Sequence, residues 1–310
     1  MKLINPEVRI ENTNFCNANC IICPRDQMTR KKVTMSNRHF NILVEQAIEL
    51  GAKTISIFGY GEPLMDRGII NKVAYCTKRG LDTFITTNAS LLGVETQTLL
   101  LKAGLKKIRF SFHGVHKNYD KVHKGLRFDD SVRNFTNFVS KNRVRFGGQC
   151  KVAMTVIPMN GESIEEIRKY WEYGVDELEI WQPHGWGSPE FRGITKERKK
   201  TCGRPHVGPV QIQADGKVIP CCFLTDGEII LGDTRKNTIK EILKGDAYKK
   251  LRKQHSTGNL KGLPCDVCDQ LNIGDNPLLY SNVDSSCSIG KTSSTKFNLE
   301  EKNDLHTSSA

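Results

Sequence analysis

The sequence has no long hydrophobic run. Of its 310 residues, 38% are hydrophobic and only 7% are aromatic, and no stretch approaches the roughly 18 apolar residues that a membrane-spanning helix needs. Residues 1–6 also lack the apolar segment of a secretory signal. These absences predict a protein that has no membrane contact and works in the cytoplasm.

Acidic residues are outnumbered: 34 Asp and Glu stand against 46 Lys and Arg, for a net charge of +12. A basic surface can attract phosphates or nucleic acid. However, the densest basic run, Arg30-Lys31-Lys32, is short, and no basic stripe is interleaved with the aromatic residues that stack single-stranded bases. We therefore expect a solvated basic surface and no nucleic-acid partner.

Cysteine, by contrast, is abundant, with eleven residues. Because a reducing cytoplasm disfavours disulfides, metal binding or catalysis is the expected use. The cysteines cluster, three within residues 16–23 and five within residues 202–268. Cys76 and Cys150 are expected to be small core residues, and Cys287 lies in the tail.

Residues 8–182 alternate between short β-rich runs and amphipathic helical runs. Strands are predicted over 8–13, 53–58, 83–87, 107–112, 151–157 and 177–181, and helices near 36–50, 67–79, 94–103, 129–142 and 162–173. Successive β/α units form a parallel sheet with right-handed crossovers. Six of them predict an α/β fold, a partial (β/α)6 TIM-like barrel.

The composition changes after residue 183. A Pro- and Gly-rich stretch is followed by a predicted hairpin over 209–214 and 217–222, a helix near 238–254, and a Ser/Thr/Lys-rich tail. The predicted domains are a barrel core at 1–183, a linker at 184–207, a small C-terminal cluster-binding extension at 208–275, and a disordered tail at 276–310.

Three cysteines follow the first predicted strand with the spacing Cys16-x3-Cys20-x2-Cys23. Three thiolates in eight residues can hold one face of an iron–sulfur cube, which usually takes four cysteines. One iron would then stay open for a ligand; a zinc site is the alternative. The spacing resembles the CxxxCxxC motif of the radical S-adenosylmethionine (SAM) superfamily.

This resemblance implies that a 4Fe–4S cluster on Cys16, Cys20 and Cys23 binds SAM and cleaves it to a 5′-deoxyadenosyl radical. Gly61-Glu62-Pro63, after the second strand, is similar to the family's glycine-rich turn that holds the SAM amino group. Active sites of β/α barrels form at the carboxyl ends of strands. Polar residues at later strand ends are further candidates for SAM binding: Asn88, Ser111 and His113, with Asn160 after the fifth strand.

A second cysteine group has the spacing Cys202-x13-Gly216-x4-Cys221, followed by Cys265-x2-Cys268. It resembles the SPASM/twitch extension of radical SAM enzymes. The resemblance implies a second, auxiliary 4Fe–4S cluster that these four cysteines ligate completely. Because soft thiolates also suit zinc, a structural zinc site is the alternative.

The resemblance implies an enzyme that abstracts hydrogen from a sugar-like or peptide substrate, in an oxidation or an epimerisation, with a flavodoxin- or ferredoxin-type reductant. Cys222 is left over by the ligand spacing and is a candidate hydrogen donor. Strand alternation predicts that it points away from Cys221, toward the barrel mouth or the core. His184 and Trp186 are candidates to face the substrate. A non-catalytic iron–sulfur electron carrier or a zinc-binding module is the alternative, and Gly61-Glu62-Pro63 argues against a carrier.

Overall fold

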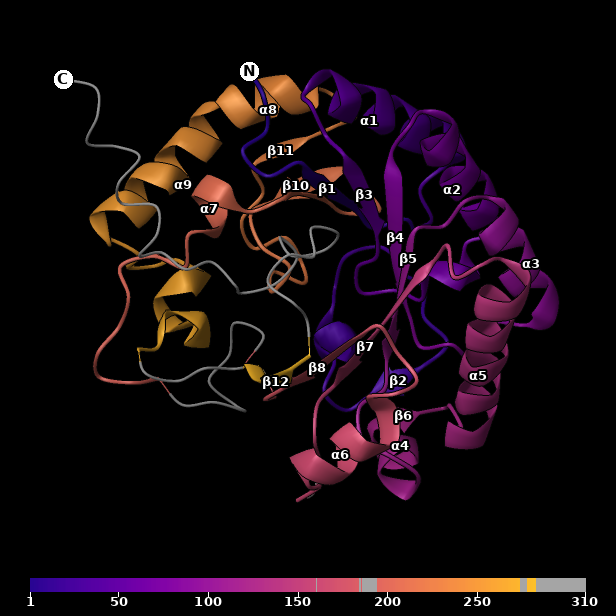
Figure 1. Ribbon diagram of the computed structural model, residues 1–310. Helices are drawn as coiled ribbons and strands as arrows, with labels where there is room; N and C mark the ends of the chain where they lie inside the picture. The colour runs from indigo at the N-terminus through magenta and orange to yellow at the C-terminus, as the bar shows by residue number, and fades with distance from the viewer. Residues whose placement is uncertain (160, 184, 186–193, 274–277, 283–310) are drawn as a thin grey trace.

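A curved ten-stranded sheet forms the centre of the computed structural model, which describes residues 1–159, 161–183, 185, 194–273 and 278–282 (Figure 1). Its strand order is β11-β10-β9-β1-β3-β4-β5-β7-β8-β12. The six central strands are mutually parallel. They are β1 (Glu7–Ile10), β3 (Thr54–Ile57), β4 (Asp82–Thr87), β5 (Lys107–Ser111), β7 (Lys151–Val156) and β8 (Glu177–Trp181). The predicted partial (β/α)6 barrel is confirmed.

Helices cover the outer side of the curved sheet in Figure 1. They are α1 (Asn37–Glu49), α2 (Ile69–Lys78), α3 (Val94–Lys102), α5 (Phe128–Arg145) and α6 (Ile164–Trp171). On α1, Phe40, Leu43, Val44 and Ala47 are buried at helical spacing, so one face packs on the sheet. Gly51 follows α1 with a φ of 84°, a left-handed conformation that a glycine adopts without steric cost.

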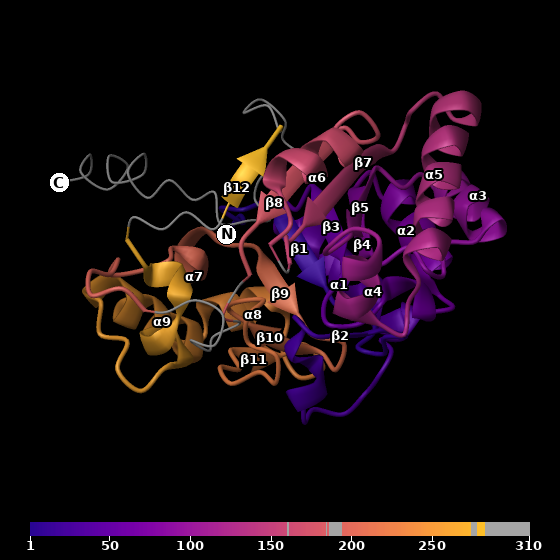
Figure 2. The same ribbon diagram turned by 90° about the horizontal axis from the view of Figure 1, so that it is seen from below.

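The C-terminal extension continues the barrel sheet. β9 (Val210–Ile212) pairs in parallel with β1, and β10 (Lys217–Ile219) and β11 (Gly232–Asp233) follow as antiparallel neighbours. Together with α7 (Arg204–Val207), α8 (Ile239–Lys244) and α9 (Asp246–Thr257), they lie beside β1, away from α2, α3 and α5 (Figure 2). The single helix predicted near 238–254 was wrong: Gly245 is extended, ends α8 and precedes α9.

β12 (Leu278–Ser281) pairs antiparallel with β8 at the other edge of the sheet. The prediction of disorder from residue 276 was therefore wrong for these four residues. The Tyr280 hydroxyl donates to Glu172 Oε1 at 2.6 Å, and the Arg168 guanidinium lies 4.8 Å from the Tyr280 ring centroid. These contacts to α6 stabilise a strand that the polar composition of the tail conceals.

A second, two-stranded sheet joins β2 (Asn19–Cys20) to β6 (His123–Lys124), which follows the short helix α4 (Lys117–Val122). The Tyr119 ring of α4 stacks on the His123 ring with 4.2 Å between centroids. The pairing brings the first cysteine loop next to a histidine about a hundred residues later in the sequence. Short 3-10 helices complete the described elements: η1 (Pro24–Gln27), η2 (Pro63–Met65), η3 (Pro264–Val267) and η4 (Asp269–Leu271).

Several predicted residues have no place in the cavity described below. Cys76 and Cys150 are buried in the core, as predicted. Asn160, His184, Trp186 and Cys287 lie outside the described residues. No helix in the described ranges is both long enough and apolar enough to cross a membrane.

Candidate active site

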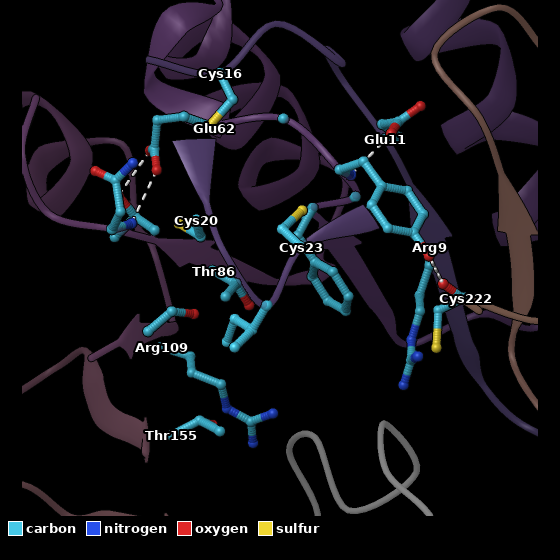
Figure 3. Close-up of a pocket in the computed structure, with 18 of the residues that line it drawn as sticks. Arg9, Glu11, Cys16, Cys20, Cys23, Glu62, Thr86, Arg109, Thr155 and Cys222 are labelled. Atoms are coloured by element: carbon cyan, nitrogen blue, oxygen red, sulfur yellow. Dashed lines mark hydrogen bonds between the residues drawn. The ribbon is translucent and has the colours of Figure 1, made fainter. Parts of the chain in front are cut away.

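A cavity of about 360 Å³ begins at the carboxyl ends of the parallel strands and extends along their inner face (Figure 3). Its walls come from the first cysteine loop, the strand ends and the C-terminal hairpin. Of the residues predicted from the sequence, it brings together Cys16, Cys20, Cys23, Gly61, Glu62, Asn88, Ser111, His113 and Cys222. Pro63 is buried at the start of η2 and is not among the lining residues.

Cys16, Cys20 and Cys23 are half-buried at the cavity wall. Burial, together with the neighbouring thiols of Cys23 and Cys16, raises the pKa of Cys20 to about 12. These thiols are therefore protonated at neutral pH when no metal is bound, and binding iron would displace their protons.

Three soft sulfur donors on one loop fit an iron–sulfur cube by their chemistry. Across the described ranges, no three His, Cys, Asp or Glu side chains converge closely enough to hold a single metal ion. A cube spreads its irons over several corners, so its ligands need not converge on one point.

His123, which the sequence reasoning missed, contacts Cys20. Its Nε2 accepts a hydrogen bond from the His113 backbone N–H at 3.0 Å, so the ring proton lies on Nδ1. Nδ1 is 3.2 Å from Cys20 Sγ and donates to it. Burial lowers the pKa of His123 well below 6.5, so the ring stays neutral. A side chain in this position donates to a cluster ligand from outside the cluster.

Glu62 is held at the cavity wall by three donors, although it is only 2% exposed. Its Oε1 accepts from the Thr87 hydroxyl at 2.7 Å and from the Leu64 backbone at 3.1 Å. Its Oε2 accepts from the Asn88 backbone at 2.8 Å. Burial raises the pKa of Glu62 to about 6 in spite of these hydrogen bonds, so a carboxylate faces the cavity at neutral pH.

The turn before Glu62 requires glycines, because the backbone segment that follows β1 packs closely against this turn. A Cβ on Gly61 would lie 2.2 Å from the carbonyl oxygen of Thr13. A Cβ on Gly59 would lie 2.4 Å from the Glu11 side chain. Only glycine permits so close an approach.

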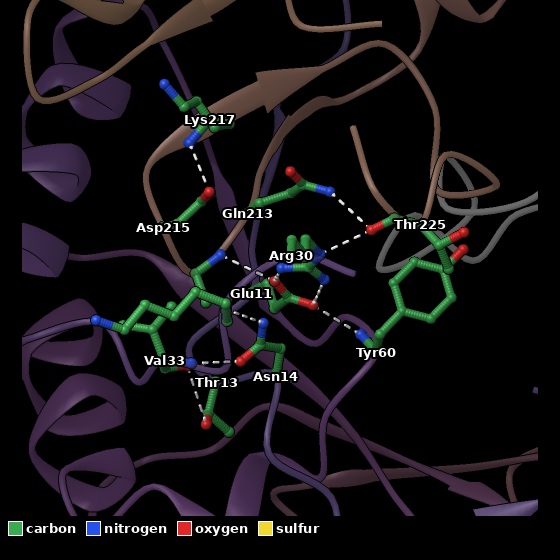
Figure 4. A network of polar contacts seen from close by, with 12 residues as sticks. Glu11, Thr13, Asn14, Arg30, Val33, Tyr60, Gln213, Asp215, Lys217 and Thr225 are labelled. Atoms are coloured by element: carbon green, nitrogen blue, oxygen red, sulfur yellow. Dashed lines mark hydrogen bonds and ion pairs between the residues drawn. The ribbon is translucent and has the colours of Figure 1, made fainter. Parts of the chain in front are cut away.

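Glu11, at the end of β1, joins the cysteine loop, this turn and the hairpin (Figure 4). Arg30 donates to both carboxylate oxygens of Glu11, at 2.6 and 2.7 Å. The same oxygens accept from the backbone N–H groups of Tyr60 and Ala214, each at 2.9 Å. Such a bidentate, buried pair is a strong and directional contact. No local pattern in the sequence signals it, because Glu11 and its three partners come from four separate segments.

The second cysteine group lies in the C-terminal extension. Burial raises the pKa of Cys265 to about 12, and the nearby Cys202 and Cys268 thiols add to the effect. Cys202 also acts on Cys221, so the four thiols form one electrostatically coupled neighbourhood. Arg204 Nη1 donates to Cys221 Sγ at 3.1 Å. Four thiolates beside a buried cation fit a fully ligated iron–sulfur cluster.

Cys222 lies beyond the strand on which it was predicted. β10 ends at Ile219, because Pro220 has no N–H with which to continue the ladder. Cys221 and Cys222 lie in the following turn, and their thiols share a hydrogen bond. The strand predicted over 217–222 was therefore too long, but its open question is answered: Cys222 lines the cavity, whereas Cys221 does not. Its carbonyl accepts a hydrogen bond from the Tyr60 hydroxyl.

Comparison with known protein families agrees with this geometry. The model of the radical SAM superfamily matches residues 10–170, just over half of the chain. The chain belongs to the radical SAM superfamily. A model of an iron–sulfur cluster-binding domain, SPASM, matches residues 202–269. The protein is thus a radical SAM enzyme whose cofactors are a 4Fe–4S cluster, SAM and an auxiliary iron–sulfur cluster.

Individual relatives are distant. A probable GTP 3′,8-cyclase of Sulfurisphaera tokodaii is 23% identical over 77% of this chain and 86% of its own. The structure of BtrN in complex with AdoMet and 2-DOIA is 18% identical, with a TM-score of 0.61 over 87% of this chain and 93% of that chain. Streptococcus suis SuiB bound to precursor peptide SuiA is 16% identical, with a TM-score of 0.64 over 86% and 70%. At these identities the two structures support the fold alone.

Proposed function

We propose that this enzyme abstracts a hydrogen atom from a C–H bond of a sugar-like or peptide substrate, and that the outcome is epimerisation or oxidation. One observation carries the proposal. Cys16, Cys20 and Cys23 line the same cavity as Cys222 from the C-terminal extension. A substrate in this cavity would therefore lie between the radical-generating site and a thiol.

When bound, the cluster and SAM supply a 5′-deoxyadenosyl radical. Cys16, Cys20 and Cys23 would hold the cluster by thiolate ligation. The Glu62 carboxylate, whose orientation is fixed by its three donors, would accept a hydrogen bond from the SAM amino group. Asn88, Ser111 and His113 line the cavity where the rest of SAM would bind. Apolar side chains exclude water from this region: Ile22, Phe58, Ile157 and Trp181.

Cys222 favours epimerisation over oxidation. Without metal, the hydrogen bond between the two thiols lowers the pKa of Cys222 and raises the pKa of Cys221. Thiolate ligation of a cluster by Cys221 would reverse this order, so that Cys222 would carry the proton and donate it within the hydrogen bond. In an epimerisation, the S–H bond of Cys222 breaks homolytically, and a new C–H bond forms on the substrate radical. The thiyl radical left on Cys222 returns to a thiol by taking up one electron and one proton. A flavodoxin- or ferredoxin-type reductant supplies the electron. An oxidation needs no such donor.

The substrate class is supported by the ligands of similar structures. The BtrN structure holds the small molecule 2-DOIA, whereas the SuiB structure holds a precursor peptide. Both folds resemble the one described here, so we keep both classes in the proposal. A non-catalytic electron carrier would not need Glu62 at a cavity wall.

The test is Cys222→Ala with candidate aminoglycosides and peptides in deuterated water. The parent enzyme is expected to place deuterium at the reacting carbon, because the thiol proton exchanges with solvent. The variant should still form 5′-deoxyadenosine but lose net inversion. Full turnover by the variant, together with no deuterium in the parent's product, would eliminate the donor role and favour oxidation.

A further inference from the structure

We propose that Arg9 and Arg109 form a subsite for an anionic group of the substrate, a carboxylate or a phosphate. The inference rests on the proposed function and names a chemical feature of its substrate. Both arginines line the cavity, from the inner face of β1 and β5. Neither belongs to a motif that the sequence analysis identified.

Arg9 is buried, and part of its guanidinium has no hydrogen-bond acceptor among the described residues. The residue is 4% exposed, and its Nε donates to Glu7 Oε1 at 2.8 Å. Its Nη2 is buried and finds no hydrogen-bond partner among the described residues. The guanidinium lies 5.3 Å from the centroid of the Phe58 ring. A buried N–H group without an acceptor is costly, so an acceptor from a ligand would stabilise it.

The Arg109 guanidinium also has a buried N–H group without an acceptor in the described part of the chain. Its Nε is buried and also lacks a partner within the described ranges. The nearest acid is Glu179, whose Oε2 is 3.6 Å from Arg109 Nη2, too far for a hydrogen bond. That oxygen already accepts from Trp181 Nε1 at 3.0 Å. The guanidinium is held in place by the Phe84 ring, 5.3 Å away.

The acids on these strands are already engaged. Glu7 accepts from Arg9 and from the Ser56 hydroxyl. Glu177 pairs with both Lys107 and Lys151. Among the described residues, the ion pairs of this network join four cations, Arg9, Lys107, Arg109 and Lys151, to three acids, Glu7, Glu177 and Glu179. Arg204, a further cation of the cavity, donates to Cys221.

A hydroxyl group completes the subsite. Thr155 Oγ1 on β7 is buried and has no partner in the part of the chain that the structure describes. In Figure 3 the Arg9 and Arg109 guanidinium groups extend toward the same region of the cavity, with Thr155 beside Arg109 and Cys222 beside Arg9. Guanidinium groups present several N–H donors in a geometry that matches the oxygens of carboxylates and phosphates. An anionic group here would place the attached carbon skeleton near Cys222.

The carboxylate of SAM is the competing occupant, so the experiment is done with SAM at saturation. Binding of radiolabelled inorganic phosphate to the anaerobically reconstituted protein is measured by equilibrium dialysis. We expect one saturable site per chain. Arg9→Gln and Arg109→Gln should each weaken it at least tenfold, and Arg109→Lys should weaken it less. Arg145→Gln, at an exposed arginine of α5, is the matched control and should change nothing.

Acetate as a competitor distinguishes the two anions: displacement at concentrations similar to phosphate indicates a carboxylate site, and weak displacement indicates a phosphate site. The proposal is overturned if the parent shows no saturable binding, if SAM displaces the phosphate, or if the glutamine variants bind like the parent. Iron content and SAM affinity of each variant show whether its fold is intact. Failure to form 5′-deoxyadenosine while phosphate still binds would count against the proposed function alone.

Discussion

The two cysteine groups of this protein are built in opposite ways. Cys16, Cys20 and Cys23 lie within eight residues and line the cavity. Cys202, Cys221, Cys265 and Cys268 come from three separate segments, and none of them is among the lining residues. Three ligands beside a cavity leave an iron open to a small molecule, whereas four ligands away from it close their cluster. On the function proposed above, radical generation belongs to the first group and a supporting role to the second.

Hydrogen bonds hold the two regions together. Glu11 contacts Arg30 of the first loop and Ala214 of the hairpin. Asp226, beyond the second region's turn, accepts from the backbone N–H groups of Thr29 and Arg30, at 2.8 and 3.1 Å. The cavity between the regions therefore has a wall from each, fixed by charged groups. The first four predictions below change one region and use the other as the reference.

The largest effect is expected from the first group. Changing Cys16, Cys20 and Cys23 together to Ala should abolish the formation of 5′-deoxyadenosine, because no cluster remains to bind and reduce SAM. The measurement is anaerobic, dithionite-dependent 5′-deoxyadenosine production by reconstituted protein. About four irons per chain should remain in the second region. Product formation at the parent rate would show that these cysteines do not hold the SAM-binding cluster.

The second cysteine group is tested by measuring the iron content of the protein. The parent should hold about eight irons per chain, and the double variant Cys265→Ala/Cys268→Ala should hold about four, with SAM binding retained. Cys222→Ala is the matched control. Cys222 is next to the predicted ligand Cys221 but is not expected to be a ligand itself, so its loss should leave the iron content unchanged. If Cys222→Ala loses iron and Cys221→Ala does not, the ligand assignment must move by one residue.

The same comparison separates what the sequence could predict from what it could not. The first triad and the six parallel strands depend on short-range spacing and periodicity, so both were accessible. His123 reaches Cys20 through the pairing of β2 with β6, and Ala214 reaches Glu11 through the pairing of β9 with β1, each time between segments about a hundred or more residues apart. No local pattern encodes such pairings. The extent of the strand before Cys222 was wrong for a different reason: Pro220 ends the strand on which alternation was assumed.

Glu62 gives the next largest effect. Glu62→Gln keeps the size of the side chain but loses the charge-assisted hydrogen bond to the SAM amino group, a loss of about 1.5–3 kcal/mol. SAM affinity, measured by titration followed through the cluster spectrum, should fall by roughly ten- to hundredfold. Iron content should hold in both regions. Glu166→Gln, on the exposed face of α6, is the control. An unchanged SAM affinity in Glu62→Gln would remove this role.

His123 should tune one cluster and not the other. His123→Leu removes the N–H donor to Cys20, which leaves more electron density on that sulfur and should make the reduction potential of the first cluster more negative. His123→Gln, which can still donate an N–H, should restore part of the shift. An anaerobic redox titration followed by electron paramagnetic resonance reports both clusters. Equal shifts of the two potentials would indicate a general structural effect instead of the hydrogen bond.

The smallest expected effect concerns the acid stability of the second region. His255 on α9 is buried, its Nδ1 is 2.8 Å from the Thr201 hydroxyl, and burial lowers its pKa to about 4. An unfolded chain binds this proton near pH 6.5. His255 therefore favours the folded state fully above pH 6.5, and this contribution is lost as the pH falls toward 4. His255→Gln cannot take up the proton, so the unfolding temperature of the reconstituted protein should decrease less between pH 7 and pH 5 than that of the parent, by about 2–4 °C. Parallel curves for the two proteins would show that another group causes the acid sensitivity.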